Sequence, residues 1–94
     1  IKIFKGKKGK VCRVDIETDP SNRETDMILS FRALAHVGFY AKKPFLKFIL
    51  ICHLPEPYVP AVAESQANCA VKYFVRGKIT EQTWRQDCLI EKKL

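Results

Sequence analysis

Residues 45–54 constrain the fold of this chain more than any other stretch. They contain an uninterrupted apolar run from Phe48 to Cys52, and Pro44 and Pro55 stand on either side. The stretch is too short to cross a membrane, and it is too rich in β-branched and aromatic residues to favour a helix. We therefore predict that it forms the central strand of a sheet. Because both faces of this strand are apolar, another layer of structure must cover at least one of them.

An amphipathic helix that supplies this cover is predicted over about residues 21–37. Apolar side chains recur there at helical spacing, with charged and polar side chains on the other side. Ser21 and Glu24 have the spacing of a capping box, which marks the start of a helix. Gly38 is the expected C-cap, because glycine readily adopts the left-handed conformation that ends many helices.

The remaining segments predict a hairpin, loops and further strands. Residues 1–4 and 10–16 flank a turn rich in glycine and lysine, which is typical of a β-hairpin. Residues 55–60 contain three prolines and residues 61–68 have few large apolar side chains, so both segments are expected to be loops. Trp84 is expected to anchor the core or an interface. Further strands are predicted over residues 70–76, 78–85 and 88–90.

Together these elements predict a single α+β domain over residues 1–94. One α-helix would pack on a twisted antiparallel β-sheet that begins with an N-terminal β-hairpin. A chain of 94 residues buries only a modest apolar area on folding, so covalent cross-links would help to stabilise it.

Four cysteines indicate disulfides rather than zinc, because none of them has the spacing of a CxxC or CxxH knuckle. We favour a Cys12–Cys88 bridge, since each cysteine lies near a chain end on a strand-like run. Cys52–Cys69 is the second candidate bridge, and a free buried Cys52 thiol is its alternative. Disulfides indicate a secreted protein. The chain opens without a signal-peptide pattern, so we expect any such leader to have been removed.

Positive charge is concentrated in clusters. The formal net charge is +7, with one lysine cluster in the first ten residues and a second at Lys42 and Lys43. Such clusters attract polyanions without reading their sequence. A solvated hairpin tip that keeps a small protein soluble explains the first cluster equally well.

Several segments taken together resemble a known family. They are the early strand with Cys12, the Lys43-Pro44-Phe45 start of the central strand, the Tyr58-Val59-Pro60 loop, the Ala70-Val71-Lys72-Tyr73-Phe74-Val75 segment before Gly77, and the terminal Asp87-Cys88-Leu89-Ile90-Glu91. The chain resembles the RNase-like proteins associated with haustoria (RALPH), which are secreted effectors of powdery mildew fungi. These effectors are themselves similar to the small fungal guanyl-specific ribonucleases. The resemblance implies a ribonuclease-like fold.

The same resemblance implies a site without catalytic groups. Ribonucleases of this type need a general base, a general acid and a cation. Carried over to this sequence, the expected histidine position is Phe45, the glutamate position is Tyr58 and the arginine position is Val71. None of these residues transfers a proton near neutral pH or carries a charge. We therefore expect a pseudo-ribonuclease with no enzyme activity, no cofactor and no metal.

The resemblance also implies the partners. It indicates a virulence or avirulence effector that acts inside the plant host by binding host RNA or host proteins, and that an intracellular NLR immune receptor recognises. We expect a monomer with no membrane contact. Tyr58 or Tyr73 would stack on RNA bases. The predicted RNA-binding residues are Lys5, Lys7, Lys8, Lys10, Lys42, Lys43 and Arg76.

Two other classes of function are left open. An active ribonuclease with a rearranged site would use His53, Glu56, Arg76 and Arg85 if the fold brought them together. A strand-end histidine partly in water is the simpler interpretation of His53. A cystatin-like inhibitor also places one helix across a sheet, but this chain lacks the Gln-x-Val-x-Gly hairpin of that class.

Overall fold

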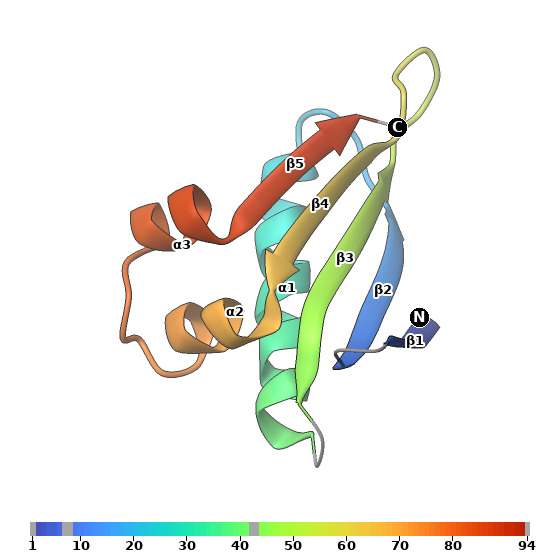
Figure 1. The fold of residues 1–94 in the computed structure, drawn as a ribbon. Coiled ribbons are helices and arrows are strands. Elements are labelled where there is room, and N and C mark those ends of the chain that lie inside the picture. The colour runs from blue at the N-terminus through green and yellow to red at the C-terminus, as the bar shows by residue number, and fades with distance from the viewer. Residues whose placement is uncertain (1, 7–8, 42–43, 94) are drawn as a thin grey trace.

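The chain folds into a sheet with helices packed on one of its faces (Figure 1). The computed structural model describes residues 2–6, 9–41 and 44–93. Its five-stranded sheet has the order β1-β2-β3-β4-β5. The elements in chain order are β1 (Lys2–Gly6), β2 (Gly9–Glu17), α1 (Arg23–Tyr40), β3 (Phe45–His53), β4 (Ala61–Gln66), α2 (Ala67–Phe74), α3 (Glu81–Asp87) and β5 (Leu89–Lys93).

The α+β class is confirmed, but the expected architecture of one helix on an antiparallel sheet is wrong. The described residues form three helices, and the sheet is mixed because β2 and β3 run parallel. The other neighbouring strands are antiparallel. The parallel pair follows from α1, since a helical crossover returns the chain to the end of the sheet where the previous strand began.

The prediction of a central strand is confirmed. β3 pairs with β2 on one side and with β4 on the other. Phe48, Leu50 and Cys52 on one face of β3 are buried in the core with the helices. Ile49 and Ile51 alternate with them and lie on the opposite face of the sheet, as the two-residue period of a strand requires. The apolar run is therefore explained mainly by its helix-covered face.

Helix α1 covers β3, but its ends differ from the prediction. Its N-cap is Asn22, whose backbone N–H donates to the Asp19 carboxylate at 2.9 Å, so the expected capping box of Ser21 and Glu24 does not form. Gly38 is not the C-cap, because the helix continues to Tyr40. A Cβ atom on Gly38 would lie 2.8 Å from the Phe48 ring. This glycine therefore permits the close approach of α1 to β3.

Three of the segments beyond the proline loop differ from the prediction. The expected loop over residues 61–68 is β4 and the start of α2, and the expected strands over residues 70–76 and 78–85 contain α2 and α3. Ala67, Ala70 and Phe74 repeat at helical spacing and contribute to the core, which outweighs the β propensity of the aromatic residues. The last predicted strand is confirmed as β5, shifted toward the C-terminus.

Trp84 anchors the core, as predicted. It is fully buried, and its indole Nε1 donates to Ser65 Oγ at 2.9 Å. Its ring packs against Phe31 edge to face, with centroids 5.6 Å apart, and stacks on Tyr73 at 5.7 Å. One residue thus connects α3 to α1, α2 and β4.

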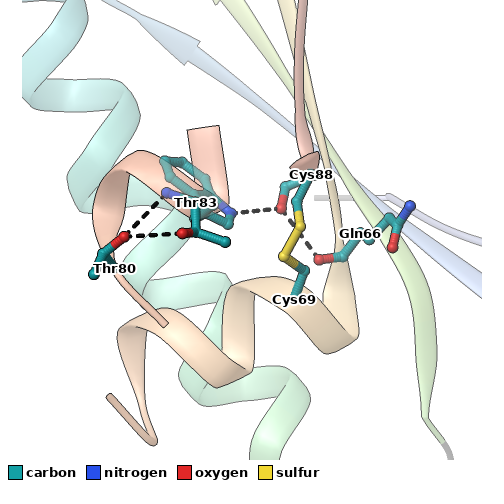
Figure 2. The surroundings of a disulfide bond; sticks show 7 residues. Gln66, Cys69, Thr80, Thr83 and Cys88 are labelled. Carbon is teal, nitrogen blue, oxygen red and sulfur yellow. Dashed lines mark hydrogen bonds between the residues drawn. A yellow bond between two sulfur atoms is a disulfide. The ribbon is translucent and has the colours of Figure 1, made fainter. Parts of the chain in front are cut away.

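The disulfide joins Cys69 to Cys88, so both predicted pairings are wrong. Figure 2 shows the bridge between α2 and the turn that follows α3. Cys12 and Cys52 are free and buried on β2 and β3, where burial raises the pKa of both thiols. The Cys12–Cys88 prediction fails because Cys12 pairs with Phe48 on β3, and both β3 and β4 separate β2 from the last strand. Cys52 is a free buried thiol, which confirms the alternative to the Cys52–Cys69 bridge.

Candidate functional site

Two adjoining hollows lie where α1 ends and β3 begins. The first, the α2 hollow, has a volume of about 450 Å³ and lies between this junction and α2. The second, the β2 hollow, has a volume of about 550 Å³ and lies on the side of β2. Both are lined by Ala41 and Phe45. We call the two together the groove; the end of α1 and the start of β3 are at the bottom of Figure 1.

The α2 hollow combines an apolar wall with a cation on an aromatic ring. Phe45 and Val71 contribute apolar side chains, and Asn68 in the first turn of α2 contributes an amide. Arg76, directly after α2, places its guanidinium carbon 5.2 Å from the centroid of the Phe39 ring. A cation at this distance is attracted by the negative face of the ring.

The β2 hollow repeats this combination with other residues. The Lys10 Nζ atom lies 4.4 Å from the centroid of the Phe45 ring, because Lys10 pairs with Phe45 in the parallel register of β2 and β3. Tyr40 and His36 on α1 complete the wall. Tyr40 is 79% exposed, the largest value among the exposed large apolar side chains.

Phe39 and Tyr40 separate the two hollows. Consecutive residues on a helix point in directions about 100° apart, so Phe39 lines the α2 hollow and Tyr40 lines the β2 hollow. Their rings meet edge to face, with centroids 5.0 Å apart and planes at 79°. The two hollows therefore have differently oriented aromatic surfaces.

Among the described residues, the charged side chains that line the groove are cations. They are Lys10 and Arg76, and no described lining residue is a carboxylate. Lys42 and Lys43 follow Ala41 in the sequence but lie outside the described residues. The site can thus attract an anion and stack a flat ring at the same place.

The structure brings together some of the predicted RNA-binding residues. Lys10 and Arg76 line the two hollows of the groove. Lys5 lies on β1 opposite Lys10. Lys7 and Lys8, like Lys42 and Lys43, lie outside the described residues.

The three positions of the vestigial ribonuclease site do not converge. Phe45 and Val71 both line the α2 hollow, but Tyr58 lies in the loop after the far end of β3. Tyr58 lines a separate hollow of about 340 Å³ with Arg23 and Glu91. Two of the three positions, Phe45 and Val71, therefore lie in one hollow, and Tyr58 lies in another.

Tyr73 has a structural position rather than the predicted stacking position. Its ring stacks on the buried Trp84, and its hydroxyl donates to Glu81 Oε1 at 3.2 Å. Burial and the neighbouring Glu81 carboxylate raise the pKa of Tyr73. Its ring face toward Trp84 is therefore already occupied.

His53 belongs to a charge cluster on the sheet face opposite the helices. Its Nε2 atom lies 3.1 Å from Asp15 Oδ2, and Arg13 Nε donates to Asp15 Oδ1 at 3.0 Å. The hydrogen bond from Arg13, followed by that from His53, lowers the pKa of Asp15 to about 2. The cluster contains a carboxylate and a cation, so its charges largely compensate each other.

The rearranged ribonuclease site does not assemble. Arg76 lies in the groove, at the end of β3 away from His53. Arg85 binds Glu24 at 2.7 Å and Glu81 at 2.8 Å on the helical side. Glu56 is an exposed loop residue beyond the end of β3. These residues therefore do not form one acid–base centre.

His36, Phe39 and Tyr40 line the groove but are not among the site residues predicted from the sequence. The prediction that the helix ends at Gly38 leaves Phe39 and Tyr40 outside it, whereas both lie on α1. The run Phe39-Tyr40-Ala41-Lys42-Lys43, in which aromatic residues stand beside lysines, was the signal for this site.

The described residues show neither a helix that could cross a membrane nor a cluster of metal ligands. No helix within residues 2–6, 9–41 and 44–93 has the length and apolar character to cross a membrane. The same residues contain no group of three or more potential metal ligands. Comparison with protein-family models, curated proteins and solved structures gives no match.

Proposed function

We propose that this chain is a secreted, non-catalytic effector that binds RNA in its groove. One observation carries the RNA-binding part. No described residue that lines the groove is a carboxylate, and its two cations, Lys10 and Arg76, each lie on an aromatic ring. Cations beside aromatic surfaces are the combination with which proteins hold RNA backbones and unstacked bases.

The absence of catalysis is part of the proposal. Phe45 and Val71 take the positions where the ribonucleases that the chain resembles carry histidine and arginine. The α2 hollow has no carboxylate or imidazole among its described lining residues. A bound phosphodiester there would meet Arg76 and Asn68 but no group that takes or returns a proton near neutral pH.

The ribonuclease-like fold also belongs to the proposal. The helix α1 across the sheet and the hairpin of β1 and β2 support it. The parallel pairing of β2 with β3 and the helices α2 and α3 differ from the expected single helix on an antiparallel sheet.

The setting of this function is a plant host. The Cys69–Cys88 bridge supports passage through an oxidising compartment, and hence secretion. The resemblance to RALPH effectors supports action in a plant cell, where an NLR immune receptor or another host protein is the further class of partner.

A salt titration of RNA binding tests the proposal. A labelled ribosomal RNA fragment would be titrated by fluorescence anisotropy between about 50 and 200 mM salt, the range in which phosphate contacts are lost. We expect binding at low salt that weakens as salt rises. The double variant Lys10→Gln, Arg76→Gln should bind more weakly, with a salt slope smaller by about 1.4, since each contact to a single strand contributes about 0.7.

A matched variant separates the groove from net charge. Arg32 and Lys78 are exposed and do not line the groove, so Arg32→Gln, Lys78→Gln removes the same charge elsewhere. Equal losses in the two double variants would mean that the groove is not the site. Absence of binding at low salt would refute RNA binding altogether.

An RNA cleavage assay tests the absence of catalysis. We expect no cleavage by the wild-type protein. Cleavage that survives purification and disappears in His53→Ala would instead assign a ribonuclease activity to the cluster of Arg13, Asp15 and His53.

A further inference from the structure

We infer that the groove binds unpaired nucleotides, with one base on each side of the Phe39–Tyr40 pair. This inference rests on the proposed function and names the class of RNA that the site selects. The inference depends on the shape of the groove. Binding of RNA by charge alone would not depend on that shape.

The first argument is the division of the groove. Phe39 lines the α2 hollow and Tyr40 lines the β2 hollow, and their ring planes differ by 79°. Two bases that follow each other in a stacked helix are nearly parallel, so they cannot lie on both rings. Two splayed bases of an unpaired strand can.

The second argument is the exposure of Tyr40. Tyr40 is 79% exposed, whereas Leu34 and Ala35, more than one turn earlier on α1, are buried. An exposed aromatic ring with cations nearby offers a face for stacking, and every base has a face that can use it. In a duplex these faces are covered by the neighbouring base pairs.

The third argument is the placement of the cations. Arg76 reaches the groove from the end of α2 and Lys10 from β2, so one cation lies on each side of the aromatic pair. In the α2 hollow, the planar guanidinium of Arg76 on Phe39 is itself a stacking surface. An RNA strand that runs from one hollow to the other would meet an aromatic ring and a cation in each hollow. The base of each nucleotide can stack on the ring, and its phosphate can contact the cation.

Size is consistent with this ligand. The hollows have volumes of about 450 and 550 Å³, within the range of roughly 300–1,000 Å³ that is typical of small-ligand sites. Each can accept a nucleoside rather than the stacked interior of a duplex. An acidic peptide shares the negative charge but has no flat ring at every repeat, so we commit to RNA.

Binding of an eight-nucleotide RNA, single-stranded or annealed to its complement, tests this inference. We expect the wild-type protein to bind the single strand at least tenfold more tightly. Tyr40→Ala should weaken binding of the single strand about 5- to 150-fold, the range for loss of one stacked base, and should leave the salt slope and the duplex affinity unchanged. Tyr40→Phe, which keeps the ring, should retain the wild-type affinity.

Tyr58→Ala is the matched control. Tyr58 is also an exposed tyrosine, at 54%, but it lies at the other end of β3. We expect no change in affinity for this variant. Because Tyr40 is mostly exposed, its substitution should leave the thermal unfolding midpoint near that of wild type, which a melting curve verifies.

Each other outcome is decisive. Equal binding of both RNA forms, with Tyr40→Ala silent and Lys10→Gln, Arg76→Gln still weakened, would overturn the selection of unpaired nucleotides and leave RNA binding intact. Competition by a poly-glutamate peptide of equal charge, with the same dependence on Tyr40, would assign the groove to an acidic polypeptide. Absence of binding to either RNA would overturn both proposals.

Discussion

The cations at the two ends of β3 have different neighbours. At the far end, the carboxylate of Asp15 lies within 3.1 Å of both Arg13 and His53. At the groove end, Lys10 and Arg76 lie on aromatic rings, and no carboxylate is found among the described lining residues. A cation held by a carboxylate has little attraction left for a distant anion, whereas a cation on a ring keeps its full charge. The comparison indicates that net charge alone does not identify a polyanion site.

The disulfide holds α2, which lines the groove, so removing it should produce the largest effect. Cys69 and Cys88 are 19 residues apart, and closing a loop of this length contributes about 3 kcal/mol in the chain-entropy treatment. Cys69→Ala, Cys88→Ala should lower the free energy of unfolding in urea by about that amount. Amide exchange should accelerate in α2, the wall of the groove, more than at the His53 end of β3.

Substitution of a free cysteine is the control for the double variant that lacks the bridge. Cys12→Ala keeps the bridge and removes a buried thiol. This variant should lose less free energy of unfolding than the double variant. Its amide exchange should not accelerate more in α2 than in the rest of the chain. A double variant as stable as wild type would show that the bridge is dispensable.

Gly38 tests the packing that holds α1 on the groove end of β3. Because a Cβ atom would lie 2.8 Å from the buried Phe48 ring, Gly38→Val forces α1 and β3 apart. We expect a loss of about 2 kcal/mol in the free energy of unfolding, typical of an overpacked core. Ala33→Val, at an exposed position of the same helix, should cost only a few tenths of a kcal/mol through helix propensity. Similar losses in the two variants would contradict the close-approach role of Gly38.

A carboxylate placed in the groove would remove the difference between the two ends. Val37 lines the β2 hollow and is 56% exposed, so Val37→Glu introduces negative charge there with little change in packing. We expect RNA affinity to fall about tenfold at low salt and less at high salt, because salt screens the repulsion.

Leu29→Glu provides the control for this variant. Leu29 is on the same helix and is equally exposed, at 55%, but it does not line the groove. Both variants change the net charge by the same amount. A comparable loss of affinity in both would mean that RNA responds to overall charge and not to the groove.

The smallest effect is expected at the far end, in acid. The folded-state pKa of Asp15 is about 2, below its ordinary value of 3.8, so its contribution to stability is present above pH 4 and is lost as the pH falls toward 2. Asp15→Asn should therefore be slightly less stable than wild type near neutral pH and equally stable near pH 2. Comparing thermal unfolding midpoints across this range provides the measurement. RNA affinity should not fall in this variant.

The central strand and the N-terminal hairpin could be predicted because local signals agreed there. The apolar run from Phe48 to Cys52 fits a buried strand, and the flanking prolines mark both ends of that strand. The segment over residues 67–74 could not be predicted in the same way. Tyr73 and Phe74 favour a strand locally, and only the packing of Ala70 and Phe74 on the core reveals the helix.

Only some residues of the groove could be predicted from the sequence. Lys10 and Arg76 were identified by charge, but their proximity to Phe45 and Phe39 depends on the parallel register of β2 with β3 and on the position of α2. An antiparallel sheet was expected, so that proximity could not be foreseen. Phe39 and Tyr40 were missed for a local reason: Gly38 suggested a helix end, whereas its actual constraint is the distant Phe48 ring.

The two free cysteines have a consequence for the oxidation of the chain. Four thiols allow six different single bridges, and random oxidation would form mostly incorrect ones. In the folded chain Cys12 and Cys52 are buried, and burial raises the pKa of both thiols, which disfavours the thiolate that attacks a disulfide. The folded core thus keeps two of the four sulfur atoms out of exchange with the Cys69–Cys88 bridge.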